Sequence, residues 1–228
     1  MPYAIAIDGP AGAGKSTIAR ALAKELQFIY VDTGALYRTV GLYILRNRIA
    51  PADSEAIAAS LPGLRVTLGY VCGEQRVFLN EEDVSDSIRT PEVSMAASAV
   101  SAVPAVRAFL LQTQRDMAAA HSVVMDGRDI GTTILPQAQV KIFLTASAEA
   151  RAQRRFAELL EKGTDTTYEA VLQDMEKRDY DDTHRAISPL QQAADAVLVD
   201  TSHDTLAQAI ERVRQTVAAR LPHSGQEA

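Results

Sequence analysis

A glycine-rich segment near the N-terminus carries residue types that bind nucleotide phosphates. Gly9, Gly14, Lys15 and Ser16 match the pattern G-x-x-x-x-G-K-[ST], in which backbone N–H groups surround phosphate oxygens. In such a loop the lysine ammonium reaches the β- and γ-phosphates, and the serine hydroxyl is a ligand of Mg²⁺. We therefore expect binding of ATP with Mg²⁺ and transfer of its terminal phosphate. The predicted ATP-binding residues are Gly9, Pro10, Ala11, Gly12, Ala13, Gly14, Lys15, Ser16 and Thr17.

The residues on either side predict the strand and the helix that such a loop requires. Residues 4–8 are an apolar run that ends on Asp8, and apolar residues recur at helical spacing from Ile18 to Leu26. A helix that begins at the loop directs its first N–H groups toward the phosphates. A glycine turn that only joins a strand to a helix would need neither the lysine nor the hydroxyl.

Four more apolar runs predict the rest of a sheet. The runs are continuous, as is typical of strands buried on both faces, and helical segments separate them. This alternation predicts an α/β fold with a five-stranded parallel sheet and helices on both faces. The predicted strands are 4–8, 28–32, 122–126, 140–145 and 196–200. Since ligands of such sheets bind at the carboxyl ends of strands, Asp32 and Asp126 are candidates to support Mg²⁺ through water, whereas Asp200 is expected to cap a turn.

Two segments depart from this alternation. Residues 64–88 alternate apolar and polar around turn residues, which predicts a small antiparallel insertion. It is either a surface hairpin or part of a subdomain that closes on substrate. Residues 148–186 form an arginine-rich helical region, in which Arg151, Arg154 and Arg155 share one predicted helix face. A mobile lid with arginines would supply charge to a phosphoryl transfer after closing. We expect both segments to belong to one domain that spans 1–228.

Composition narrows the class of protein. The 228 residues include 23 Lys and Arg against 29 Asp and Glu, and the net charge of −6 argues against a nucleic-acid coat. No apolar run approaches the 18 residues or so of a membrane span. The predicted first strand leaves no room for a signal peptide, so we expect a cytoplasmic protein. Cys72 is the single cysteine, which excludes an intramolecular disulfide.

Several stretches in this order resemble bacterial cytidylate kinase, a nucleoside monophosphate kinase. Besides the phosphate loop, they are Asp32–Arg38, Ile88–Val93, Asp126–Thr132, Val140–Leu144 and Arg178–Arg185. The resemblance covers about residues 4–221. It implies phosphorylation of CMP and dCMP by ATP with Mg²⁺, without a covalent enzyme intermediate. It also implies a monomer with no nucleic-acid or membrane partner, and an antiparallel insertion in the monophosphate-binding region, which 64–88 fits.

The resemblance further implies roles for individual residues. Thr33 and Arg38 match the monophosphate site, and Arg128 matches a further phosphate contact. The residues that match contacts to the cytosine edge are Ser98, Arg107 and Asp129, and those that match the sugar and phosphate site are Arg178, Asp182 and Arg185. Arg151, Arg154 and Arg155 fall where such enzymes carry lid arginines. The implied catalytic residues are Lys15, Arg128, Arg151 and Arg155.

The chemistry of cytosine agrees with a carboxylate at position 129. Cytosine presents an amino donor at N4 where uracil presents an acceptor at O4. The Asp129 carboxylate would accept a hydrogen bond from the first and repel the second. A site with a buried polar partner of this kind discriminates strongly between two bases.

Two alternatives remain open from the residues alone. The first is another small phosphate-loop kinase, with UMP, AMP or a non-nucleotide alcohol as the acceptor. The second is a nucleotide-dependent switch without transfer activity, which the several arginine clusters disfavour. The sequence has no Asn-Lys-x-Asp guanine signature and no catalytic loop of the protein-kinase type, so a regulatory GTPase and a protein kinase are both poor interpretations.

Overall fold

The computed structural model describes residues 2–71 and 74–221 of the chain. The chain forms two compact units. The first comprises Met1–Tyr30 and His121–Ala228, and the second comprises Val31–Ala120. Cys72, Gly73 and residues 222–228 lie outside the described residues.

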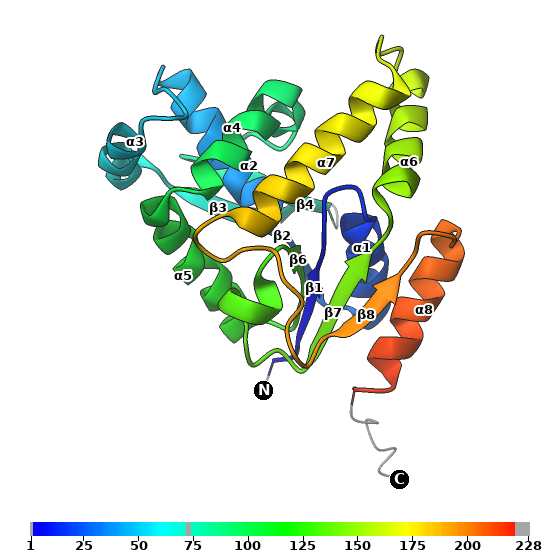
Figure 1. The fold of residues 1–228 in the computed structure, drawn as a ribbon. Helices are drawn as coiled ribbons and strands as arrows, with labels where there is room; N and C mark the ends of the chain where they lie inside the picture. The colour runs from blue at the N-terminus through cyan, green and yellow to red at the C-terminus, as the bar shows by residue number, and fades with distance from the viewer. Residues whose placement is uncertain (1, 72–73, 222–228) are drawn as a thin grey trace. The chain divides into compact units, whose positions relative to one another are not determined.

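A five-stranded sheet is the frame of the first unit (Figure 1). Its strands follow the order β2-β6-β1-β7-β8, in which β1 pairs in parallel with β6 and β7, and β7 pairs in parallel with β8. All five residues of β1 and of β6 are buried, which explains why these strands are continuous apolar runs. The strands are β1 (Ala4–Asp8), β2 (Ile29–Asp32), β6 (Val123–Gly127), β7 (Val140–Thr145) and β8 (Val197–Asp200). They confirm the predicted strands to within one residue at each end.

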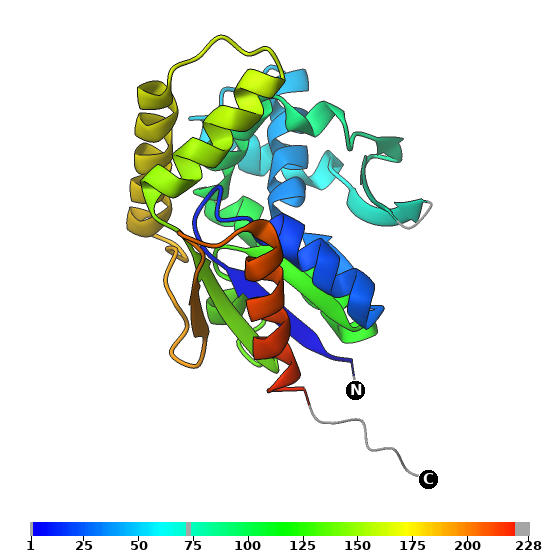
Figure 2. The same ribbon diagram turned by 90° about the vertical axis from the view of Figure 1, so that its right-hand side faces the viewer.

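Two helices of the first unit, α1 (Lys15–Leu26) and α8 (Leu206–Ala218), lie side by side on one face of the sheet (Figure 2). Their apolar residues, such as Ile18 and Val213, pack against β1 and β7. Between β6 and β7 the chain forms a short π-helical turn, η3 (Ile130–Ile134), which contacts β1 and β6. This packing fixes the loop after β1 and the loop after β6 at the same edge of the sheet.

The helices α6 (Ala148–Glu161) and α7 (Tyr168–His184) pack against each other as a hairpin. Their contact has a small apolar cluster of its own, with Ala152, Val171 and Met175. Helix α7 continues to His184. The rings of Tyr180 and His184 stack at 4.0 Å between centroids, and the Thr183 hydroxyl donates to the Asp179 carbonyl, so the last turn remains helical.

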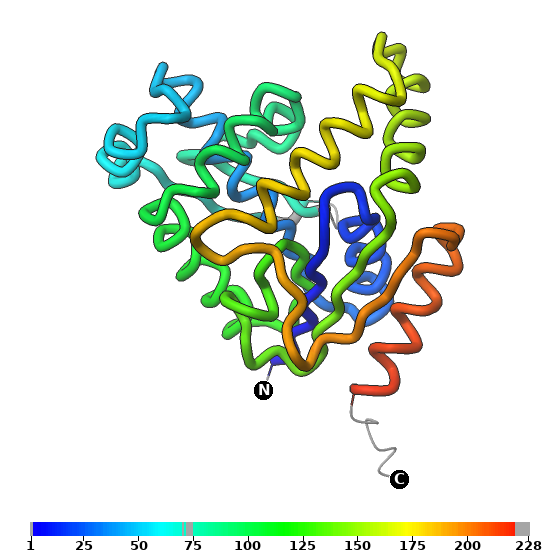
Figure 3. Tube along the Cα trace, in the orientation of Figure 1, coloured from blue at the N-terminus to red at the C-terminus, as the bar shows by residue number. Residues whose placement is uncertain are grey.

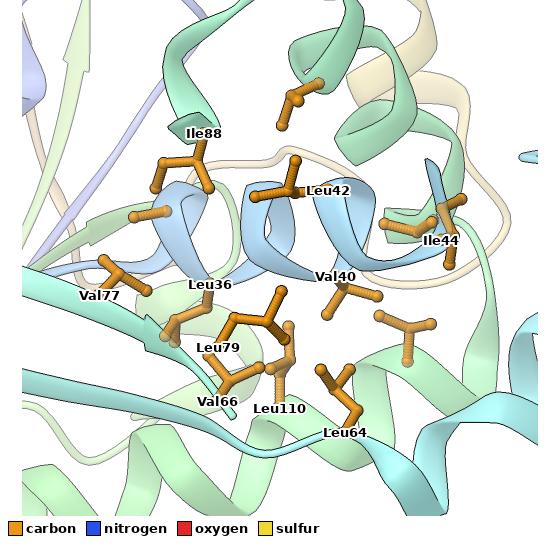
Figure 4. Close-up of a cluster of buried hydrophobic side chains, with 14 of the residues drawn as sticks. Leu36, Val40, Leu42, Ile44, Leu64, Val66, Val77, Leu79, Ile88 and Leu110 are labelled. Atoms are coloured by element: carbon orange, nitrogen blue, oxygen red, sulfur yellow. The ribbon is translucent and has the colours of Figure 1, made fainter. Parts of the chain in front are cut away.

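The second unit is built around α2 (Thr33–Arg46). Its other elements are α3 (Ser54–Ser60), η1 (Leu61–Gly63), β3 (Val66–Val71), β4 (Glu74–Leu79), β5 (Glu82–Asp83), η2 (Ser87–Arg89), α4 (Pro91–Ser101) and α5 (Pro104–Ala120). The strands form an antiparallel sheet in the order β3-β4-β5, which confirms the predicted insertion. Leu36 and Val40 of α2 meet Val66, Leu79 and Leu110 in one buried cluster (Figure 4). This cluster holds the first two turns of α2, which carry Thr33 and Arg38, in place within the unit.

Among the described residues, no single helix is long and apolar enough to cross a membrane. The pair α4 and α5 reaches the required length and composition only when both helices are taken together, and they are bent by 98° at their junction. Val93, Val100 and Leu110 of this pair are buried in the core of the second unit.

Candidate active site

The loop between β1 and α1 begins with a backbone conformation that only glycine permits. Gly9 has a φ of 151°, and a Cβ at this position would lie 1.9 Å from the carbonyl oxygen of Leu144 on β7. Gly14 has a φ of 87° and is the N-cap residue of α1. Figure 3 shows the chain turning sharply through this loop before it enters α1. The N–H groups of the first turn of α1 therefore face the open side of the loop, where an anion is favoured.

Lys15, the first residue of α1, is buried and lies against its own loop. Its ammonium Nζ donates a hydrogen bond of 2.7 Å to the carbonyl oxygen of Pro10. Burial, followed by the positive charge of Arg128, holds the pKa of this ammonium well below its usual range, although Asp126, Asp182 and Asp8 oppose the shift. A phosphate at the loop would supply the negative charge that the lysine lacks in this state.

Ser16 and Asp126 form a hydroxyl–carboxylate pair at the ends of two elements. Ser16 Oγ donates to Asp126 Oδ2 at 2.8 Å, and Asp126 is buried near the end of β6. Asp32, the other predicted candidate to support Mg²⁺, belongs to the second unit and is the N-cap residue of α2. Its carboxylate accepts hydrogen bonds from Ala35 N and Arg38 Nη2, each at 2.9 Å. Asp126 thus contacts the serine that the loop pattern assigns to the metal.

Asp8, for which the sequence suggested no role, is a buried carboxylate at the end of β1. Its two oxygens accept hydrogen bonds of 2.8 Å from the N–H groups of Ile130 and Gly131. Burial is the largest influence and raises the pKa of the Asp8 carboxyl to about 6. The position at a strand end was the only sequence signal, and it did not indicate which groups Asp8 contacts. Asp200, by contrast, accepts hydrogen bonds from Ser202 N and Oγ, which confirms the predicted turn cap.

The buried charge of Asp8 makes a prediction for stability and pH. Because the folded-state pKa of about 6 lies above the unfolded value of 3.8, the native state binds this proton more tightly. The protein should therefore gain stability relative to Asp8→Asn as the pH falls from 7 to 4, and lose this gain as the pH rises through 6. The full shift corresponds to about 3 kcal/mol. Urea unfolding of both proteins across this range measures the effect, and a difference that does not vary with pH would contradict it.

The loop after β6 and the end of α7 bring together several residues that the resemblance implies for the acceptor. Arg128 Nε donates to Asp182 Oδ2 at 2.6 Å. Arg185 lies 3.6 Å from Asp129 and 3.9 Å from Asp182, measured between guanidinium nitrogen and carboxylate oxygen. Arg178, in contrast, is half-exposed and lies 3.9 Å from Asp174 on its own helix. The structure thus assembles four of these residues in a charged group and leaves Arg178 on the surface of α7.

The three arginines of α6 have three different environments. Arg151 is buried, donates to both carboxylate oxygens of Asp179, and donates from Nη1 to the Ala11 carbonyl in the phosphate loop at 2.9 Å. Arg154 donates to the carbonyl of Thr201. Arg155 is exposed and forms a 3.0 Å ion pair with Glu158. The three arginines therefore have different partners, although the sequence places them on one helix face. Asp179, which the sequence did not single out, anchors Arg151 to the loop.

In the second unit the start of α2 holds the residues that the resemblance implies for the monophosphate. Thr33 is buried, and Arg38 is a quarter exposed and paired with Asp32. Gln75 of β4 accepts a hydrogen bond of 3.2 Å from Asp32 N through its side-chain oxygen. The antiparallel insertion therefore contacts the segment that carries Thr33 and Arg38. This contact joins Asp32, where β2 ends and α2 begins, to the start of β4, 43 residues further along the chain. The sequence did not indicate it.

Two of the three residues implied for the cytosine edge, Ser98 and Arg107, lie on α4 and α5 of this unit. Arg107 on α5 is buried, and its guanidinium carbon lies 5.7 Å from the centroid of the Tyr37 ring. Arg107 Nη1 donates to the Ser101 carbonyl at 3.3 Å. Ser98 lies exposed on α4. Tyr37, which follows the start of α2 by one turn, thus orients a cation that the sequence analysis connected with the base.

Comparisons with known proteins identify the family to which the chain is similar. A family model described as cytidylate kinase matches residues 5–219. A cytidylate kinase from Caldicellulosiruptor bescii is 49% identical over 209 residues, which cover 92% of this chain and 92% of that protein. One from Mycolicibacterium paratuberculosis is 51% identical over 217 residues, which cover 95% of each chain. The solved structure of an uncharacterised protein from Eubacterium ventriosum matches with a TM-score of 0.50 at 14% identity, over 96% of this chain and 99% of that one. At that identity the last match shows the fold alone.

Proposed function

The chain belongs to the cytidylate kinase family and phosphorylates CMP and dCMP with ATP, and we propose that Mg²⁺ and the residues of the candidate site carry out this transfer. The family match over residues 5–219 is the observation that carries the proposal. The residues proposed for ATP are those of the loop from Gly9 to Thr17. Of the residues proposed for CMP, Thr33, Arg38, Ser98 and Arg107 belong to the second unit. Those of the first unit are Arg128, Asp129, Arg178, Asp182 and Arg185.

The contacts of Ser16 support a magnesium site. Its hydroxyl hydrogen is directed to Asp126, so the lone pairs of its oxygen are available to a cation. Mg²⁺ prefers oxygen ligands and is usually bound by one or two protein groups together with phosphates and water. Residues 2–71 and 74–221 contain no cluster of three metal-binding side chains, which agrees with a metal held largely by its nucleotide. Ser16 would hold Mg²⁺ directly and Asp126 through water, and the ion would neutralise charge on the transferred phosphate.

The reaction needs positioning and charge, and the side chains supply both. A phosphate oxygen of CMP attacks the γ-phosphorus of ATP in line, the bond to the bridging oxygen breaks, and ADP leaves. Lys15 exchanges the Pro10 carbonyl for the phosphates of ATP, which are stronger acceptors. Arg38 and Arg128 similarly exchange Asp32 and Asp182 for phosphate. No side chain is required as a covalent intermediate.

The proposed role of Arg151 differs from that of Arg155. Arg151 already donates to the Ala11 carbonyl and to Asp179, so it contributes by holding the backbone of the phosphate loop. Arg155 has only an exposed ion pair with Glu158, which is worth little in water. Arg155 can therefore leave Glu158 for a phosphate when α6 and α7 close, in the manner of a lid arginine.

A panel of acceptors tests the proposed function directly. The purified chain is given ATP and Mg²⁺ with CMP, dCMP, UMP, AMP or a non-nucleotide alcohol, and ADP release is measured in a coupled assay. We expect the highest kcat/KM with CMP and dCMP. Equal rates with all acceptors, or ATP hydrolysis that no acceptor changes, would contradict the assignment.

Ser16→Ala should raise the Mg²⁺ concentration that gives half-maximal activity about tenfold, because one direct oxygen ligand is removed. The measurement is the rate of CDP formation as a function of free Mg²⁺ at fixed ATP. Thr216→Ala is the control, since it removes a helical hydroxyl on α8 that lies outside the proposed site. An unchanged Mg²⁺ requirement in Ser16→Ala would exclude Ser16 as the ligand, and full activity in EDTA would exclude the metal.

We also propose that the enzyme works as a cytoplasmic monomer on small molecules, without a nucleic-acid or membrane partner. The net charge of −6 supports this because it disfavours binding to polyanions. Sedimentation equilibrium at several protein concentrations tests the monomer, and a mass that rises with concentration would contradict it.

A further inference from the structure

Asp8 connects the two loops that the proposed function places around the transferred phosphate. It is the last residue of β1 and directly precedes Gly9, the first residue of the phosphate loop. Its carboxylate oxygens accept the N–H groups of Ile130 and Gly131, each at 2.8 Å. These two residues directly follow Arg128 and Asp129 in the chain. One side chain therefore holds the loop after β6 against the start of the phosphate loop.

The attachment requires a carboxylate rather than a neutral polar group. Two N–H donors need two acceptor oxygens, and an ionised carboxylate has both with no donor of its own. An asparagine would direct its NH₂ group at one of the two N–H groups and leave that donor unsatisfied. Asp8 is only 4% exposed, so the ionised form is held at a cost in desolvation. Charged groups buried in this way are expected at functional positions more than at purely structural ones.

The loop that Asp8 holds has little freedom to shift. A Cβ on Gly131 would lie 3.1 Å from Lys141 Cδ and 3.4 Å from Asp8 Oδ2. Lys141 is itself fixed, because its Nζ donates to the Pro136 carbonyl and to both oxygens of Asp195. Gly131 thus lies close to Asp8 and to a lysine side chain that is held by its own hydrogen bonds. A displacement of the loop would have to break at least one of the two hydrogen bonds to Asp8.

We propose that Asp8 is a positioning residue for nucleotide selection, because it fixes the positions of Arg128 and Asp129 relative to the phosphate loop. Asp8 itself touches neither nucleotide in this role. The inference rests on the proposed function, in which Asp129 contacts the cytosine edge and Arg128 the phosphate. Small displacements of such groups have large effects on a transfer that depends on alignment.

Asp8→Asn tests the inference. We expect the KM for CMP to rise about tenfold and the preference for CMP over UMP, measured as the ratio of kcat/KM values, to fall about tenfold. The KM for ATP should change less than the KM for CMP. A loss of folding alone would reduce the active fraction and leave this ratio unchanged, so the ratio separates positioning from general damage.

Asp200→Asn is the matched control. Asp200 also ends a strand of the same sheet and also accepts a backbone N–H, that of Ser202, but no proposed site residue follows it. Its variant should retain the wild-type KM values and the preference for CMP. If Asp200→Asn changed the preference as much as Asp8→Asn, the effect would belong to the sheet in general, and the inference would be wrong.

Gly131→Ala provides a second test that leaves Asp8 in place. The added methyl group would lie 3.1 Å from Lys141 Cδ, so the loop has to shift to relieve the contact. We expect the preference for CMP to fall in this variant as well. Wild-type preference in both Asp8→Asn and Gly131→Ala would overturn the inference.

Asp129→Ala in the same assay separates the inference about Asp8 from the proposed role of Asp129 in base recognition. If Asp129→Ala alone changes the preference, only the role of Asp8 fails. If it does not, the proposed role of Asp129 fails and the inference fails with it.

Discussion

Lys15→Ala should lower the turnover number for CMP phosphorylation by about 10²- to 10³-fold, the usual loss when one preorganised electrostatic group is removed. Lys15 is buried at the start of α1, where a nucleotide phosphate would replace the Pro10 carbonyl as the partner of its ammonium. Negative charge grows on the transferred group in the transition state, and the variant would have no cation at this place. The measurement is kcat in a coupled ADP-release assay.

The affinity for CMP provides the internal check on this prediction. None of the proposed CMP-binding residues is Lys15, so the Kd for CMP from calorimetry should change no more than a few-fold. Lys24→Ala is the matched control, because Lys24 is exposed in the last turn of the same helix. Near-normal turnover in Lys15→Ala would exclude the loop as the site of transfer. A loss in Lys24→Ala of similar size would indicate damage to α1 instead.

Asp129→Ala should reduce the preference for CMP over UMP by about 10- to 100-fold, the range expected when one base-reading contact is lost. Asp129 is buried in the loop after β6, so its carboxylate would meet N4 of cytosine with little competition from water. The same carboxylate repels O4 of uracil, and the alanine variant should therefore gain activity toward UMP relative to CMP. Competition between the two acceptors at equal concentration measures the ratio directly.

Asp129→Asn sharpens this test, because an amide can accept from cytosine or donate to uracil. Its preference should lie closer to UMP than that of Asp129→Ala. Asp116→Ala, which removes an exposed carboxylate on α5, is the control and should leave the preference unchanged. If the CMP preference survives in both variants of Asp129, another residue reads the base.

The framework of this site could be predicted from the sequence because its signals are local. The buried strands β1 and β6 are continuous apolar runs, and the glycine pattern lies directly between β1 and α1. Each of these features depends on neighbouring residues, so no knowledge of the rest of the chain was needed. The same holds for the turn at Asp200, whose carboxylate bonds a residue only two positions away.

The partners of the charged residues could not be predicted, because they depend on which strands and helices become neighbours. Asp8 meets Ile130 and Gly131 only because β1 pairs with β6 instead of β2. Arg151 and Arg155 have the same spacing signal, but Arg151 pairs with Asp179 of α7, whereas Arg155 pairs with Glu158 of its own helix.

The order of the strands also constrains how the chain can fold. β1 pairs with β6, and Ala4 pairs with Val123, so the centre of the sheet cannot form until β6 has been synthesised. At a synthesis rate of about 5–20 residues per second, the ribosome needs roughly 6 to 24 seconds to make the intervening chain. During this time the ribosome completes Val31–Ala120, which forms a compact unit of its own. Closing so long a loop is slow, so the pairing of β1 with β6 is expected to limit the folding rate, and the apolar β1 segment is the part of the nascent chain most in need of protection from aggregation.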